Sequence, residues 1–174
     1  MFTPEEVTAR VEAVRARIDE LGGSDVGIVA VTKGFGADAV LTARAAGLFD
    51  VGESYAQEAV AKQAELRALA LEWHFIGRIQ GNKAADISRH FAWVHGLDRL
   101  RHAELLGRHR PPDMAALQVC LQVNLSGEDS KGGVRPEALQ DLADAVSRLP
   151  RLRLRGLMTM PDPNAGSARQ RDDF

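Results

Sequence analysis

The 174-residue sequence has a single cysteine, Cys120, and aromatic residues make up only 5% of it. One thiol cannot form an intrachain disulfide, which favours a reducing compartment, so we expect a cytoplasmic protein. No segment approaches the roughly 20 consecutive apolar residues of a membrane-spanning helix, and residues 1–17 are charged throughout. We therefore expect neither a membrane anchor nor a signal peptide.

An excess of charge of one sign is also lacking. The 22 Lys and Arg residues are balanced by 24 Asp and Glu residues, for a formal net charge of -2. Surfaces that bind nucleic acid usually carry a strong basic excess, so nucleic acid is not expected as a partner. The five histidines show no ligand spacing with cysteines or carboxylates, and no metal site is predicted. A small-molecule ligand is the expected partner.

The sequence does contain a regular alternation of helical and strand patterns. The first helix is the clearest, because Thr3, Pro4 and Glu6 form the start of a capping box. Short apolar runs typical of buried parallel strands then alternate with helical segments. The predicted strands span residues 26–31, 48–52, 73–77, 92–97, 117–125 and 152–159, and the predicted helices span 4–21, 37–46, 55–71, 82–90, 99–108 and 136–149.

This alternation predicts right-handed parallel βαβ units in an α/β fold. No G-x-G-x-x-G motif follows the first strand, so a (β/α) barrel of the TIM type is favoured over a dinucleotide-binding sheet. A closed barrel of this type has about eight units and about 250 residues, whereas the sequence supplies six strands in 174 residues. We expect one domain over residues 1–174, incomplete at its C-terminus.

Barrels of this type carry their chemistry at the C-terminal ends of the strands, which selects a set of candidate side chains. Lys33 is the sharpest, because a lysine that ends a buried strand is partly desolvated, and this favours the neutral amine that attacks a carbonyl. From its position alone, a lysine extended into solvent is the more frequent alternative. Likewise His74 alone fits a hydrogen-bonded core histidine. The full set is Lys33, Glu53, Ser54, His74, His95, Asn124, Ser126, Met158 and Thr159.

Six blocks spread over nearly the whole sequence carry a further pattern: 29–33, 52–58, 73–83, 122–133, 149–154 and 155–161. Together they resemble the YggS/PROSC family of pyridoxal phosphate homeostasis proteins. The resemblance implies a barrel like the N-terminal domain of alanine racemase, the fold-type III arrangement, with pyridoxal phosphate held as a Schiff base on Lys33. It also implies that Ser54, His74, Asn124 and Met158 line the cofactor site and that Lys131 is a secondary acceptor site.

The function that the resemblance implies is the binding and distribution of pyridoxal phosphate, with apo-enzymes that need this cofactor as partners and no established turnover of a substrate. A full-length member is expected to be a monomer. Two departures stand out. Ser54 occupies a position where the family usually has Asn, and family members continue beyond the region of residues 169–174 into segments that hold the cofactor phosphate. A truncated chain is therefore expected.

Two enzymatic alternatives stay open from the residues. A racemase or decarboxylase of the same fold would need an acid or base on the ring face opposite Lys33. A Schiff-base lyase of the aldolase type would use Lys33 directly on a substrate carbonyl and would need a proton relay nearby. The only tyrosine that could serve in such a relay is Tyr55.

Overall fold

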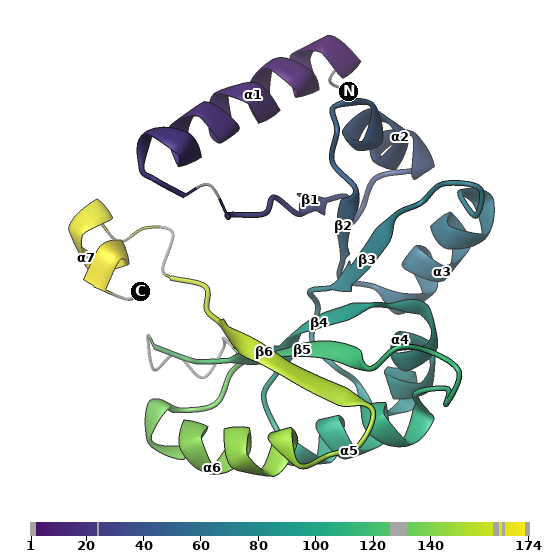
Figure 1. The fold of residues 1–174 in the computed structure, drawn as a ribbon, viewed down its shortest axis with the longest axis vertical. Helices are drawn as coiled ribbons and strands as arrows, with labels where there is room; N and C mark the ends of the chain where they lie inside the picture. The colour runs from purple at the N-terminus through teal and green to yellow at the C-terminus, as the bar shows by residue number, and fades with distance from the viewer. Residues whose placement is uncertain (1–2, 24, 126–131, 162–163, 165, 173–174) are drawn as a thin grey trace. The chain divides into compact units, whose positions relative to one another are not determined.

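The computed structural model describes residues 3–23, 25–125, 132–161, 164 and 166–172 (Figure 1). The order of the six strands in the sheet is their order along the chain, β1 to β6. The pairings with a described register, β1 with β2, β4 with β5 and β5 with β6, are all parallel. Strands in a (β/α) barrel follow one another in this way. The α/β class and the barrel-type order are therefore confirmed.

Contacts within the chain define two compact units, residues 1–74 and 75–174, and each is described by itself. The expectation of a single domain stays a prediction. The first unit contains α1 (Pro4–Glu20), β1 (Ala30–Val31), α2 (Ala37–Ala45), β2 (Asp50–Glu53), α3 (Ala56–Glu65) and most of β3 (Glu72–Phe75). The predicted capping box of α1 is confirmed, because the Thr3 side chain accepts a hydrogen bond from the Glu6 backbone and the Glu6 carboxylate accepts one from Thr3 N–H.

Two apolar clusters form the core of the first unit. Val11 of α1 packs against Ala43, Ala46 and Leu48 of the α2 region. The second cluster lies between the strands and their helices and consists of Val40, Val51 and Leu66, with Leu69, Leu71 and Trp73 packed against it. Because Leu66, Leu69 and Leu71 turn into this cluster, α3 ends at Glu65, and the helix predicted to reach residue 71 is wrong over its last turns.

β1 is much shorter than the run from residue 26 to 31 predicted. Its register pairs Ala30 with Val51 and Val31 with Gly52. Since β2 begins at Asp50, the register partner of Val29, residues before Val29 have no residue of β2 to pair with. A strand needs a partner for its backbone groups, and Val26, which is 59% exposed, therefore lies outside the sheet.

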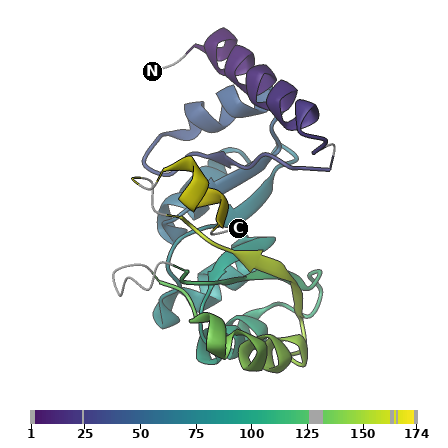
Figure 2. The ribbon, with the colours of Figure 1, turned by 90° about the vertical axis from the view of Figure 1, so that its left-hand side faces the viewer.

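The second unit has longer strands and a largely apolar core, in which Ser88, Arg110 and Gln122 are also buried. After η1 (Gly81–Lys83) and α4 (Ala84–His90) come β4 (Trp93–Leu97), α5 (Leu100–His109), β5 (Leu117–Gln122), α6 (Pro136–Ser147), β6 (Leu152–Met158) and α7 (Ser167–Asp172). Figure 2 shows α5 and α6 side by side on one face of β4–β6. The largest apolar side chains of the second unit that have no exposed surface are Ile87, Leu97, Leu106, Leu117 and Leu121.

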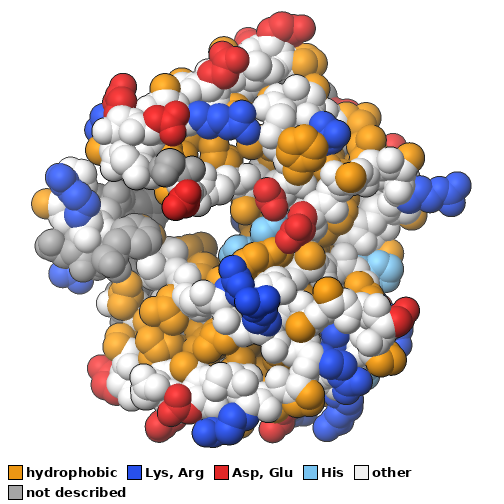
Figure 3. Space-filling view, in the orientation of Figure 1, with side chains coloured by type: hydrophobic (Ala, Val, Ile, Leu, Met, Phe, Trp, Pro, Cys, Tyr) orange, Lys and Arg blue, Asp and Glu red, His pale blue; other side chains and the backbone are white. Residues whose placement is uncertain are grey.

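Two further side chains of the second unit differ in their exposure. Cys120 of β5 is buried, and burial raises the pKa of its thiol. On β6, Leu157 is 60% exposed, and Figure 3 shows hydrophobic side chains gathered where β6 and α6 lie. No helix in the described ranges is both long enough and apolar enough to cross a membrane.

Candidate functional site

Lys33 lies in a tight turn that directly follows β1. The Thr32 carbonyl accepts a hydrogen bond from the Phe35 N–H at 3.1 Å, and Gly34 has a φ of 76°. A positive φ at the third position is the mark of a type II turn, which glycine adopts without strain. Thr32 N–H in turn donates to the Gly52 carbonyl of β2 at 3.0 Å. The turn is therefore anchored to the strand next to β1, with Lys33 as its second residue.

The Lys33 side chain is exposed, so the expected partial desolvation at the end of a buried strand is wrong. The physical reason is the shortness of β1, whose last residue, Val31, is itself 50% exposed. The Lys33 amine makes no hydrogen bond or ion pair with any residue in the described part of the chain. It is thus accessible and uncommitted, as a nucleophilic amine must be.

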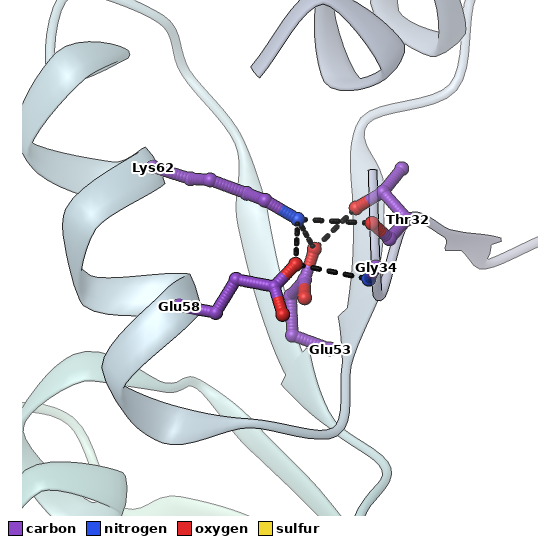
Figure 4. Close-up of polar contacts among 5 residues, drawn as sticks. All are labelled: Thr32, Gly34, Glu53, Glu58 and Lys62. Atoms are coloured by element: carbon purple, nitrogen blue, oxygen red, sulfur yellow. Dashed lines mark hydrogen bonds and ion pairs between the residues drawn. The ribbon is translucent and has the colours of Figure 1, made fainter. Parts of the chain in front are cut away.

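A buried polar cluster lies beside the Lys33 turn (Figure 4). Lys62 of α3 points its ammonium group at three oxygens: Glu53 Oε1 at 2.7 Å, Glu58 Oε1 at 2.8 Å and the Thr32 carbonyl at 2.9 Å. These three contacts use all three of its N–H donors. Thr32 Oγ1 also donates to Glu53 Oε1 at 2.5 Å. We call these four residues, Thr32, Glu53, Glu58 and Lys62, the Lys62 cluster.

Electrostatics in the Lys62 cluster favour the charged forms. Burial lowers the pKa of Lys62, but the hydrogen bonds and charges of Glu53 and Glu58 outweigh burial and raise this pKa above its ordinary value. The hydrogen bond from Lys62 holds the pKa of Glu58 below its ordinary value, although burial opposes it. Glu53 is fully buried, and its Oε2 makes no hydrogen bond within the described residues. A buried carboxylate oxygen without a hydrogen-bond partner destabilises the fold. The hydrogen bonds that the other oxygen of Glu53 accepts from Lys62 and Thr32 oppose this cost.

Of the other predicted site residues in the first unit, Ser54 is half-buried and directly follows β2, as expected. His74 is buried, and its Nε2 lies 3.0 Å from Asp50 Oδ1. Because Asp50 is the first residue of β2, this contact lies toward the amino end of the strand rather than its carboxyl end. Glu72 brings a carboxylate oxygen within 4.8 Å of both groups. The cofactor role of His74 stays a prediction, as does the absence of a metal.

The second unit holds a pocket of about 440 Å³ at the carboxyl ends of its strands. Asn124, a predicted site residue, lines it together with the loops that follow β3 and β4. Gln122 Nε2 donates to the Gly132 carbonyl at 2.7 Å and fixes one wall. At Gly96 the lack of a side chain lets the Gly77 backbone approach closely, since a Cβ there would lie 2.8 Å from the Gly77 carbonyl oxygen. The remaining lining residues are Arg78, Ile79, Gln80, Gly81, Asp98, Arg99, His102, Gly133 and Arg135.

Charged groups on the pocket wall are coupled to one another. Arg99 Nε donates to Asp98 Oδ1 at 3.1 Å, and this hydrogen bond raises the pKa of Arg99. His102 Nδ1 lies 3.5 Å from the same carboxylate oxygen. Burial nevertheless lowers the pKa of His102 below its ordinary value.

The remaining predicted residues of the second unit are placed as follows. Met158 ends β6, is half-buried, and its carbonyl accepts the Val123 N–H at 2.9 Å. Thr159 Oγ1 donates to the Val123 carbonyl at 3.2 Å. His95 is half-buried and stacks on Trp93 with ring centroids 5.8 Å apart. Ser126 and Lys131 lie outside the described residues.

Sequence reasoning missed Lys62 and Glu58 as part of the site. Glu58 and Lys62 are four residues apart on α3, a spacing that places two side chains on one face of a helix. Ala59 and Leu66 share the buried side of the same region. The spacing of Lys62 with these buried residues was thus the available signal for its burial. The spacing of Glu58 and Lys62, however, is also that of ion pairs on exposed helix surfaces.

Parallel βα units in sequential order, with an accessible lysine just after the first strand, define an α/β protein of the barrel type. The chain belongs to the family "Alanine racemase, N-terminal domain", which it matches over residues 4–172, and within it to the pyridoxal phosphate homeostasis proteins. The pyridoxal phosphate homeostasis protein of Pseudomonas aeruginosa is 52% identical over 177 residues, a match that covers 100% of this chain and 77% of that protein.

Solved structures agree with this assignment. PipY of Synechococcus elongatus PCC7942, solved with pyridoxal phosphate bound, superposes with a TM-score of 0.85 at 34% identity and covers 95% of this chain and 76% of its own. Alanine racemase from E. faecalis superposes with a TM-score of 0.68 at 13% identity over 86% of this chain and 42% of its own. At that identity the likeness to alanine racemase shows the fold alone.

Proposed function

We propose that this chain binds pyridoxal phosphate through Lys33 and acts in pyridoxal phosphate homeostasis. The observation that carries the proposal is the Lys33 amine, which is exposed, uncommitted within the described residues and held in an anchored turn. Lys62 is the opposite case, because all of its donors are occupied. The relatives support the choice of ligand: PipY was solved with pyridoxal phosphate bound.

The residues present fit this cofactor. Bound pyridoxal phosphate supplies an aldehyde that a primary amine can convert to a Schiff base. Lys33 would hold the cofactor by condensation of its amine with that aldehyde, and the aldehyde oxygen would leave as water with the two amine hydrogens. Ser54, at the end of β2, offers a hydroxyl that donates or accepts a hydrogen bond. We propose His74, Asn124 and Met158 as further cofactor contacts and Lys131 as a secondary acceptor.

The proposed partners are apo-enzymes that need pyridoxal phosphate, which a carrier would supply by exchange of its Schiff base. A reversible bond to one lysine suits such a carrier, because the bond hydrolyses to release the cofactor unchanged. We further propose a cytoplasmic location, which the single cysteine supports, since one thiol closes no intrachain disulfide. Racemisation is not proposed, because the likeness to alanine racemase shows the fold alone.

The test is borohydride reduction of the chain in pyridoxal phosphate, followed by peptide mass mapping. Wild-type chain is expected to take its main label at Lys33, and Lys33→Ala is expected to lose that label and keep at most a minor one at the secondary acceptor Lys131. The Pseudomonas aeruginosa relative, at 52% identity, serves as the positive control for the reaction conditions. Equal labelling of all four lysines in wild-type chain would contradict the proposal.

A further inference from the structure

The peptide groups on both sides of Lys33 are held by one buried ammonium group (Figure 4). Lys62 Nζ donates directly to the Thr32 carbonyl at 2.9 Å. The Gly34 N–H donates to Glu58 Oε1 at 2.9 Å, and this same oxygen lies 2.8 Å from Lys62 Nζ. Lys62 thus reaches the residue before Lys33 directly and the residue after it through Glu58.

The energetic cost of this arrangement indicates a role beyond packing. The side chains of Lys62 and Glu53 are 6% and 0% exposed. Buried ion pairs rarely gain net stability over apolar side chains of similar volume, because both charges lose their hydration. A methionine at position 62 would fill much the same space, yet it could donate to neither the Thr32 carbonyl nor Glu58. What the ammonium group adds is a fixed backbone around Lys33.

We propose that Lys62 is a positioning residue, whose buried ammonium group fixes the Lys33 turn and thereby determines where the Lys33 amine is presented to a carbonyl ligand. The proposal rests on the proposed function, since only a reacting amine needs such placement. Lysine has a long flexible side chain, so the position of its Cα is what the protein can control. Loss of that control lowers the fraction of time that the amine spends within bonding distance of the ligand.

The test compares two variants that differ only in the ammonium group. Glu53→Gln keeps Lys62 and its three acceptor positions, and Glu53→Gln/Lys62→Met removes the cation without leaving Glu53 as a buried unpaired charge. With pyridoxal phosphate as the probe, the rate of borohydride-trapped labelling at Lys33 is expected to fall at least about tenfold in the double variant relative to Glu53→Gln. Lys83→Met, which removes a lysine of the second unit, is expected to label Lys33 as the wild-type chain does.

Hydrogen exchange gives a readout that does not depend on the cofactor. In the double variant the Gly34 amide is expected to exchange at least about tenfold faster than in Glu53→Gln. The amide of Leu121, on the central strand of the second unit, is expected to keep its rate. A purely structural role would instead speed exchange throughout β2 and α3 and leave the labelling rate of the folded fraction unchanged.

A milder variant covers the case in which the double variant does not fold. Glu58→Ala removes the acceptor of Gly34 but leaves Lys62 bound to Glu53 and Thr32, and the Glu58 side chain is 32% exposed. Faster Gly34 exchange and slower Lys33 labelling are expected, each by less than in the double variant. Unchanged labelling and unchanged exchange in Glu58→Ala would overturn the proposal.

The two proposals fail in different ways. If wild-type chain takes no label at Lys33, the proposed function is wrong, and with it the reason for positioning Lys33. If wild-type chain takes the label and both Glu53→Gln and the double variant label Lys33 at one rate, the positioning proposal alone is overturned.

Discussion

The two units of the chain differ in the side chains that pack against their strands. In the first unit, β1 and β2 have 2 and 4 residues, and a buried lysine, two glutamates and a threonine hold their carboxyl ends together. In the second unit, β5 and β6 have 6 and 7 residues, and apolar side chains such as Leu117 and Leu121 fill the space beneath β5.

This difference distinguishes contacts that stabilise a unit as a whole from contacts that fix the position of particular backbone groups. Apolar contacts are non-directional and stabilise a layer without fixing any one backbone atom. Charge-assisted hydrogen bonds are directional and fix the particular groups that they join. The directional, charge-assisted hydrogen bonds lie beside Lys33 in the first unit, where the proposed function needs an amine at a defined position. Four predictions test this contrast.

The largest effect is expected from Lys62→Met alone. The substitution leaves Glu53 as an unpaired buried carboxylate, which should lower the free energy of unfolding by about 3–5 kcal/mol. Urea denaturation followed by circular dichroism measures this loss. Adding Glu53→Gln should recover most of it. Equal losses in the single and double variants would show that the unpaired charge of Glu53 is not the cause.

A slightly smaller effect is expected from Leu121→Ala in the second unit. Leu121 is fully buried, and its truncation should lower the free energy of unfolding by about 3 kcal/mol through lost apolar contacts and a cavity. The matched control is Leu157→Ala, since Leu157 is the register partner of Leu121 on β6 and is 60% exposed. A change within about 0.5 kcal/mol is expected there, and similar losses in both variants would argue against the described core.

As the pH falls, the free energy of unfolding should first lose the contribution of His102 in the second unit and then that of Glu58 in the first. His102 has a lowered pKa, so its contribution to stability is present above its ordinary pKa of 6.5 and is lost as the pH falls through the folded-state value. Glu58 also has a lowered pKa, and its contribution is lost only below its ordinary pKa of 4.5. Lys62, with its pKa raised from 10.5, loses its contribution at the alkaline end.

Urea midpoints measured in small pH steps follow both acid transitions. We expect His102→Asn to flatten the fall in stability that begins below neutral pH, and Glu58→Gln to flatten the fall at lower pH. A Glu58→Gln chain with the acid profile of the wild type would mean that the Lys62 contact does not depend on the Glu58 charge.

The smallest effect is expected at the start of α1. Thr3→Ala removes the side-chain acceptor for the Glu6 N–H and should lower the free energy of unfolding by about 1 kcal/mol. Thr8→Ala is the control on the same helix, because alanine is the better helix former, and it should be neutral or slightly stabilising. Thermal unfolding of both variants measures the difference, and a larger loss in Thr8→Ala would contradict the capping role.

Much of the fold follows from local sequence patterns. The capping box at Thr3 and the apolar run from Leu117 involve neighbouring residues only, and both were predicted. The length of β1 was not, because it depends on where β2 begins, and register is a property of two segments rather than one. The exposure of Lys33 was missed for the same reason.

The candidate site was predictable only in part. Lys33 lies two residues after β1 and Ser54 directly follows β2, near the strand ends where the sequence placed them. Lys62 was not selected, since the pairing of Glu58 with Lys62 on a helix is typical of exposed surfaces. Its burial results from the packing of α3 against the ends of β1 and β2, and the spacing of Lys62 with Ala59 and Leu66 is only a weak sign of that contact.

The most direct test of the account is the distribution of borohydride-trapped pyridoxal phosphate among the lysines of the wild-type chain. The account predicts that the label falls almost entirely on Lys33, that Lys62 takes none because its donors are occupied, and that Lys83 takes only a trace. Comparable labelling of Lys33, Lys62 and Lys83 would contradict both the proposed function and the placement of Lys33 by the Lys62 cluster.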